Sequence, residues 1–202
     1  LWKTVNTTMP ILADMRAFLE ALRGTERVGT LPPVILATLR RKMIALAGEI
    51  GDGMVFANGA RSHMAASLAA LPQARRDDPA FFVGNMIPTV ISDDMEAAKA
   101  VNRRTLTGYA MLPNYRNYWR EAGYGEEMDA VEQAIATGAQ ERIPECLSDR
   151  WLADTTLFGT AAQIREGVEA WQDAGIRTPI LVPSSTRGNQ FQAFEELFAA
   201  FA

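Results

Sequence analysis

The sequence predicts an α/β fold built on a parallel sheet, organised as one domain over residues 1–202. Short apolar runs of strand length alternate along the chain with longer segments in which apolar residues recur at helical spacing. Because each run is followed by a helical segment, successive strands are expected to lie parallel. The 202 residues are 48% hydrophobic and 22% charged, a composition that excludes collagen-like and disordered chains.

The first quarter of the chain predicts two strands joined by a helix. Apolar residues on one face predict a helix over residues 11–22, and Gly24 ends it. The apolar run at residues 34–38 is too short for a helix and is typical of a strand buried on both faces. A helix over residues 43–50 and a second apolar run at residues 53–57 follow.

The alternation continues to the end of the chain. We expect a helix at residues 61–71, a third strand at residues 81–87 that ends at Pro88, and two helices within residues 93–122. Residues 126–151 are helical but weakly patterned, and about residues 103–157 form an insertion. The last predicted elements are a helix that begins with a capping box at Thr160 and Gln163 and stops at Gly175, a strand at residues 178–182 and an amphipathic helix at residues 191–201.

Four predicted strands leave two architectures open. They can form an open sheet with helices on both faces, or the second half of an eight-stranded (β/α)8 barrel. Periodicity alone does not choose between them.

Composition excludes several classes of function. With one cysteine, Cys146, and one histidine, His63, we expect neither an internal disulfide nor a metal site. A net charge of −4 disfavours nucleic-acid binding, and without a membrane span or a signal peptide we expect a cytoplasmic chain. Residues 1–50 nevertheless carry a net charge of +3, which points to a local anion site.

The turn Thr38-Leu39-Arg40-Arg41-Lys42-Met43 is the strongest candidate site. It joins the end of a strand to the start of a helix, where free backbone N–H groups and the helix dipole favour an anion. Three consecutive cations strengthen this preference, and phosphate is the expected ligand. A solvated basic turn is the alternative.

The other candidates are weaker. Asn58 follows the second strand and either faces a ligand or only shapes the turn. His63 lies in a predicted helix without a carboxylate or cysteine partner, which is typical of a surface or packing residue. The acidic pairs Asp93-Asp94 and Glu126-Glu127 stand where acids favour a helix start, so we interpret them as caps.

Three segments together resemble the bacterial-luciferase-like flavin oxidoreductases, especially the subgroup that uses a deazaflavin coenzyme. Residues 33–55 contain Leu46-Ala-Gly-Glu49 followed by Asp52-Gly53, and residues 108–124 resemble the insertion before the last barrel repeat of that family. Phe158-Gly-Thr160 with residues 173–183 is similar to its final helix and eighth strand. The resemblance implies the C-terminal half of a TIM-type barrel, strands five to eight, with the first four strands missing.

The resemblance also implies a function. The turn formed by Leu39, Arg40, Arg41, Lys42 and Met43 would help to hold the phosphate of FMN or of a deazaflavin coenzyme, and Asn58 would face the cofactor or substrate. Many deazaflavin relatives have Gly-Pro in place of Arg40-Arg41, so the choice of cofactor stays open. The expected activity is that of an oxidoreductase or monooxygenase on a small organic substrate, by hydride transfer or oxygen activation.

The resemblance names no catalytic residue. We expect a homo-oligomer, since an unclosed parallel sheet leaves strand edges that must be covered or paired. The alternative functions are a non-catalytic truncated barrel that associates with itself and an independent phosphate-binding α/β module.

Overall fold

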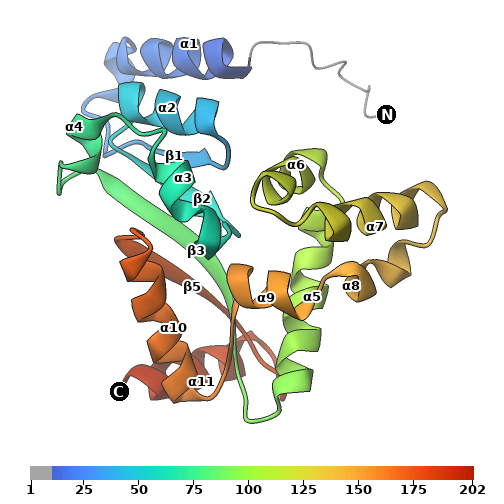
Figure 1. The fold of residues 1–202 in the computed structure, drawn as a ribbon. Helices are drawn as coiled ribbons and strands as arrows, with labels where there is room; N and C mark the ends of the chain where they lie inside the picture. The colour runs from blue at the N-terminus through green and yellow to red at the C-terminus, as the bar shows by residue number, and fades with distance from the viewer. Residues whose placement is uncertain (1–10) are drawn as a thin grey trace.

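The computed structural model describes residues 11–202 and shows a twisted parallel sheet with helices packed against it (Figure 1). Within these residues the strands are β1 (Ile35–Thr38), β2 (Gly53–Ala57), β3 (Phe82–Ile91), β4 (Leu157–Gly159) and β5 (Thr178–Ser184). Every pairing between them is parallel. The expected parallel α/β fold is therefore confirmed.

Strand β3 is the centre of the sheet. It pairs with β2 through residues 82–86 and with β5 through residues 84–90. The short strand β4 pairs with residues 89–91 of β3, and β1 pairs with β2. Because β5 occupies one edge of β3, strands β2 and β4 must share the other edge.

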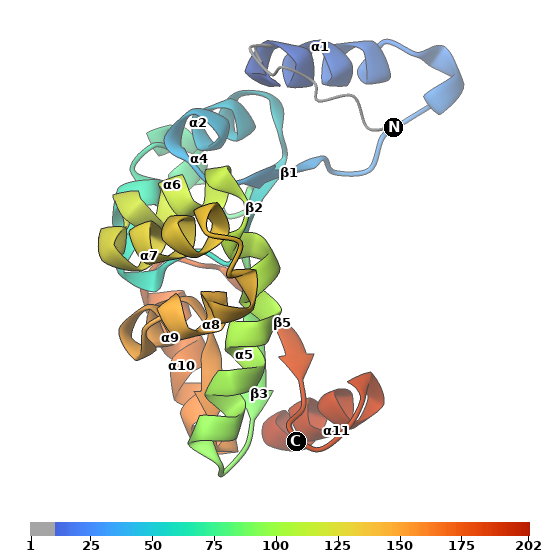
Figure 2. The same ribbon diagram turned by 90° about the vertical axis from the view of Figure 1, so that its right-hand side faces the viewer.

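Helices follow the strands and also form a separate lobe beside the sheet. Helix α1 (Ile11–Arg23) packs on α2 (Arg41–Ile50), and α10 (Ala161–Asp173) packs against β4 and β5. The lobe, made of α5 to α9, projects from one side of the sheet in Figures 1 and 2. The remaining helices and 3-10 turns are η1 (Glu26–Val28), η2 (Arg61–His63), α3 (Met64–Leu68), α4 (Gln73–Arg76), α5 (Met95–Ala110), α6 (Pro113–Glu121), α7 (Gly125–Ala136), η3 (Gln140–Arg142), α8 (Ile143–Cys146), α9 (Asp149–Thr155) and α11 (Gln190–Phe201).

The prediction that the third strand ends at Pro88 is wrong, since β3 continues to Ile91. The carbonyl of Met86 accepts a hydrogen bond from the Asn58 N–H (3.0 Å), so it points to the β2 edge of β3. Residues two apart point the same way, and the nitrogen of Pro88 therefore faces that edge too. It lies where β2 has ended and β4 has not begun, so its missing N–H costs no ladder bond.

The structure also differs from the sequence prediction in its short elements. The sequence predicted four strands, but β4 adds a fifth whose three residues are too few to show a period. The helix expected at residues 61–71 divides into η2 and α3, with α4 following separately. The weakly patterned segment contains nearly all of α7, then η3 and α8, and the first three residues of α9.

Two predicted helix starts are confirmed in atomic detail. The Asp94 carboxylate accepts a hydrogen bond from the Ala97 N–H (3.0 Å) at the start of α5. At α10 the capping box is complete, because the Thr160 N–H donates to Gln163 Oε1 (2.8 Å) and the Gln163 N–H donates back to Thr160 Oγ1. The predicted break between two helices at Pro113 is also present, between α5 and α6.

The lobe is joined to the sheet by a continuous apolar core. The rings of Trp119 and Trp151 are fully buried and meet edge to face with centroids 4.8 Å apart. They belong to the same buried cluster as Phe56 of β2 and Ile87 of β3. The lobe is therefore held firmly against the sheet.

One face of the sheet keeps apolar side chains exposed. Ile35 is 43% exposed and Met86 is 38% exposed, whereas their neighbours Leu36 and Ile87 are buried. Since side chains alternate between the faces of a strand, the exposed residues share the face opposite the buried ones. Among residues 11–202, Figure 2 shows no helix that covers this face of the sheet between α1 and α11.

None of the helices within residues 11–202 combines the length and the apolar character needed to span a membrane.

Candidate anion-binding site

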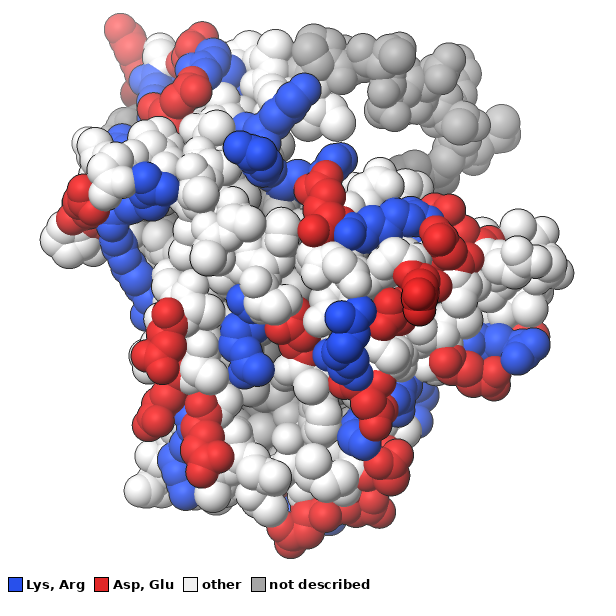
Figure 3. Space-filling view, viewed as in Figure 1, with Lys and Arg blue, Asp and Glu red and all other residues white. Residues whose placement is uncertain are grey.

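A cavity of about 570 Å3 lies where the first two strands end. Its lining residues come from three parts of the chain: Arg40, Arg41, Lys42, His63, Ala66 and Glu121. The three cations follow β1, the histidine follows β2, and Glu121 is the last residue of α6. In Figure 3 basic side chains gather between the positions of α2 and α6, next to acidic ones. The carboxyl ends of parallel strands are where ligands bind in α/β folds.

The local sequence explains why the cations converge on this cavity. Arg40 is the N-cap of α2 in an extended conformation, and the first turn of α2 contains no acidic residue. The side chains of Arg41 and Lys42 are exposed, and no ion pair involves either one within the described residues. The positive end of the helix dipole and two uncompensated cations therefore point to the same place.

Arg40 differs from its two neighbours because it has a partner. Its guanidinium donates from Nε to Glu121 Oε1 over 2.9 Å, and Nη2 donates to the same oxygen. The pair joins the β1–α2 turn to the lobe across 81 residues of sequence. Of the three cations that line the cavity, Arg40 is thus neutralised by Glu121, whereas Arg41 and Lys42 keep their charge.

The structure separates the predicted turn into two kinds of residue. Arg40, Arg41 and Lys42 line the cavity. The other three predicted residues do not: Thr38 is buried with Oγ1 donating to the Val55 carbonyl (3.4 Å), and Leu39 and Met43 pack against the core.

Asn58 is buried and lies outside the cavity lining. Its backbone has a positive φ of 57°, a conformation that asparagine tolerates better than most residues. The Asn58 carbonyl accepts a hydrogen bond from Trp119 Nε1 (3.2 Å), and the side-chain Nδ2 has no partner within the described residues. In this structure Asn58 shapes the turn after β2, and its carbonyl binds Trp119 of the lobe.

Sequence reasoning missed His63 and Glu121 as cavity residues. His63 ends η2, and its ring meets Tyr118 edge to face with centroids 5.7 Å apart. Its position five residues after Asn58, near the carboxyl end of β2, was an available signal. Glu121 reaches the cavity only through the folding of the lobe, so no local pattern could have revealed it.

Buried hydrogen bonds fix the connection that carries His63. The Ala60 N–H donates to the hydroxyl of Tyr118 (3.0 Å), and burial raises the pKa of Tyr118 to about 12, so it stays a neutral hydroxyl. Asp154 of α9 accepts from the Ser62 N–H (2.9 Å), from Ser62 Oγ (2.6 Å) and from the Tyr124 hydroxyl (2.7 Å). The lobe therefore holds one wall of the cavity in place.

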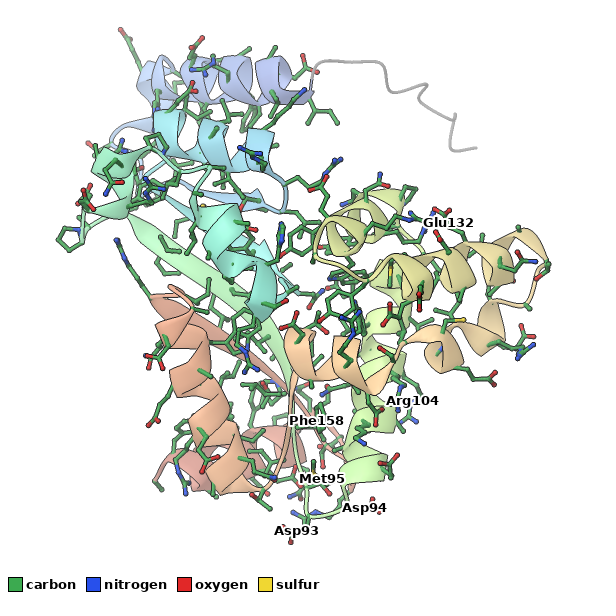
Figure 4. All side chains as sticks on the ribbon, in the orientation of Figure 1. Asp93, Asp94, Met95, Arg104, Glu132 and Phe158 are labelled. Atoms are coloured by element: carbon green, nitrogen blue, oxygen red, sulfur yellow. The ribbon has the colours of Figure 1, made fainter. Side chains whose placement is uncertain are left out.

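The remaining candidates lie elsewhere. Figure 4 shows Asp93 and Asp94 at the start of α5, far from α2, and Asp94 is the N-cap of α5. Glu126 and Glu127 stand in the first turn of α7, where acids favour a helix start, but no side chain within residues 11–202 caps α7, so the cap interpretation is wrong for this pair. Burial raises the pKa of the Cys146 thiol, which disfavours a reactive thiolate.

Comparison with known proteins shows the family of this chain. A family model described as luciferase-like monooxygenase matches residues 7–178. The chain belongs to this family. The family resemblance expected from the sequence is thereby confirmed.

One curated relative is named for the deazaflavin coenzyme F420. A Mycobacterium tuberculosis protein named as a coenzyme F420-dependent oxidoreductase is 27% identical over 165 residues, which make up 76% of this chain and 48% of that protein. The chain thus spans about half the length of this curated relative.

Two solved structures are similar in fold. The coenzyme F420-dependent tetrahydromethanopterin reductase of Methanopyrus kandleri has a TM-score of 0.65 at 14% identity, covering 84% of this chain and 51% of the reductase. An F420-dependent secondary alcohol dehydrogenase has a TM-score of 0.56 at 15% identity, covering 86% of this chain and 50% of the dehydrogenase. At these identities the likeness concerns the fold alone.

Proposed function

We propose that this chain contributes the phosphate-binding part of a luciferase-like oxidoreductase that uses a deazaflavin coenzyme. The observation that carries the proposal is the convergence of Arg40, Arg41 and Lys42 on one cavity at the carboxyl end of β1. The names of the similar proteins support a deazaflavin over FMN, since three of them refer to coenzyme F420.

The cavity residues fit a phosphate group. Arg41 and Lys42 offer two positive charges that no ion pair neutralises within the described residues, which suits the negative charge of a phosphate group. The first turn of α2 adds the positive end of a helix dipole. Arginine and lysine donors bind phosphate oxygens through charge-assisted hydrogen bonds, which are stronger than neutral ones.

A bound deazaflavin would supply the hydride chemistry, on a small organic substrate. The residues of this chain would bind and orient the coenzyme through its phosphate. The lobe would hold the His63 wall of the cavity in place through Tyr118 and Asp154. Oxygen activation by a reduced flavin is the alternative reaction, and FMN is the alternative cofactor.

The proposal includes a place for this sheet in a barrel. The strands β1, β2, β3 and β5 would be strands five to eight of a TIM-type barrel, with the exposed face that carries Ile35 and Met86 turned to the barrel interior. Support comes from this uncovered apolar face and from the half-length match to relatives.

Self-association without catalysis is a second candidate, and a specific observation favours it. Helix α11 exposes a stripe of aromatic side chains, with Phe191 78% exposed and Phe198 72% exposed. Together with the exposed sheet face, this stripe is apolar surface of the kind that mediates association. A homo-oligomer would cover both.

Titration of the purified chain with the deazaflavin coenzyme and with FMN, followed by fluorescence, tests the proposal. We expect the deazaflavin to bind, and Arg41→Ala to weaken binding. Arg104→Ala is the matched control, because Arg104 is an exposed arginine of α5 without an ion pair in the described structure, and Figure 4 shows it away from α2. Equal binding by both variants would rule out this phosphate site, and a concentration-dependent oligomer that binds neither coenzyme would favour the second candidate.

A further inference from the structure

We propose that Glu121 is a positioning residue that competes with the bound anion for Arg40. In this scheme Arg40 exchanges the Glu121 carboxylate for an anionic oxygen of the ligand, and returns to Glu121 when the ligand leaves. The inference rests on the proposed function, since it takes the cavity as an anion site.

The geometry of the pair shows that Arg40 is engaged before any ligand arrives. Both Nε and Nη2 of Arg40 donate to the single oxygen Oε1 of Glu121. In the proposed exchange a phosphate oxygen takes the edge formed by Nε and Nη2, which presents two donors in parallel. A ligand bound at this edge competes with the carboxylate for one set of donors.

Glu121 is held at the cavity wall independently of Arg40. Two residues before it, Trp119 Nε1 donates to the Asn58 carbonyl, and three residues before it the Tyr118 hydroxyl accepts from the Ala60 N–H. Both aromatic side chains are buried, so α6 keeps its position whether or not the ion pair forms. The backbone of Glu121 thus keeps its place beside the cationic turn.

Arg40 is the movable partner. Its side chain is 49% exposed and extends from an N-cap residue. Exposed ion pairs add little to stability, because solvent screens them and the long side chains lose freedom. Replacing the Glu121 oxygen by a ligand oxygen consequently costs Arg40 little free energy.

The position of Glu121 in its helix favours the return of Arg40 when the ligand leaves. It is the last residue of α6, where the negative end of the helix dipole disfavours a carboxylate. The charge of Arg40 compensates this cost in the free state. When an anion draws Arg40 away, the Glu121 carboxylate loses this compensation, so the exchange costs free energy that lowers anion affinity and favours the return of Arg40 to Glu121.

The experiment compares binding of inorganic phosphate by the full chain and by Glu121→Gln, Arg40→Gln and the double variant, using calorimetry. Removing the competitor should tighten phosphate binding by about fivefold in Glu121→Gln, the scale of one exposed ion pair. In the Arg40→Gln background the same change should have no effect on phosphate affinity. Glu145→Gln is the matched control, because Glu145 pairs with Arg142 at an exposed site outside the cavity.

Tighter binding in Glu121→Gln that disappears in the double variant supports the exchange. Unchanged or weaker binding in Glu121→Gln overturns it, and so does a gain that persists without Arg40, since the carboxylate would then act on the cavity directly. If Glu121 had only a structural role, Glu121→Gln would lower the thermal midpoint of the chain without tightening phosphate binding. Loss of deazaflavin binding alone would count against the proposed function and not against the exchange, because the probe here is phosphate.

Discussion

The hydroxyl of Tyr118 accepts a hydrogen bond from the backbone N–H of Ala60 over 3.0 Å. This bond joins helix α6 of the lobe to the segment that leaves β2, across 58 residues of sequence. Because both residues are buried, water cannot replace either partner. The cavity that holds Arg40, Arg41 and Lys42 therefore depends on the lobe for its opposite wall.

Tyr118→Phe should lower the free energy of unfolding by about 1–3 kcal/mol, since it leaves the buried Ala60 N–H without an acceptor. Urea unfolding followed by tryptophan fluorescence measures this loss. Tyr115→Phe is the control, because no hydrogen bond of the Tyr115 hydroxyl occurs in the described structure. Equal losses in the two variants would refute the role given to the Tyr118 bond.

Asp154→Ala should be more damaging than Tyr118→Phe. The carboxylate accepts from the Ser62 backbone, the Ser62 hydroxyl and the buried Tyr124 hydroxyl, so its removal leaves several donors unsatisfied. We expect a loss of about 3 kcal/mol or more in urea unfolding, since each stranded buried donor costs about 1–3 kcal/mol. Tyr124→Phe removes only one of these bonds and should cost less; a reversed order would contradict this assignment.

Acid should destabilise the lobe through Asp149. Lys99 and Arg103 lower the pKa of the Asp149 carboxyl below its usual 3.8. A carboxyl whose pKa is lower in the folded state adds stability above the unfolded value, and that stability is lost as the pH falls through the folded pKa. The thermal midpoint of Asp149→Asn should thus change less than that of the native chain as the pH falls below about 4.

Asp173→Asn is the control for this acid dependence, because Asp173 is exposed and makes no ion pair in the described structure. Its midpoint should follow the native curve over the same pH range. An unaltered acid dependence in Asp149→Asn would show that the ion pairs with Lys99 and Arg103 contribute no stability.

Met86→Lys tests the expected homo-oligomer. Met86 projects from the uncovered face of β3, so a charge there should prevent association through this face while leaving the fold intact. Sedimentation of the native chain should show an oligomer, and Met86→Lys should sediment as a monomer. Gln133→Lys introduces the same charge at an exposed position of α7 and should leave the oligomer unchanged.

The basic turn could be predicted from sequence because its signal is local. The end of β1, the start of α2 and the three cations all fall within residues 38–43. Parallel strands guarantee that such a turn lies at the carboxyl edge of the sheet, where ligands bind. This site could therefore be predicted without knowledge of any contact between distant segments.

The rest of the cavity could not be predicted because it depends on contacts between distant segments. Glu121 meets Arg40 across 81 residues, and Tyr118 meets Ala60 across 58. Strand β4 forms through its pairing with residues 89–91, and those residues continue β3 past Pro88 because both β4 and β5 pair there. Local propensity carries none of this information.

A crystal structure of the chain with the deazaflavin coenzyme tests the central claim most directly, because it shows where the phosphate lies. We predict a phosphate within hydrogen-bonding distance of Arg41 or Lys42, at the first turn of α2 in the cavity shared with His63. A coenzyme bound with its phosphate outside this cavity would contradict the account.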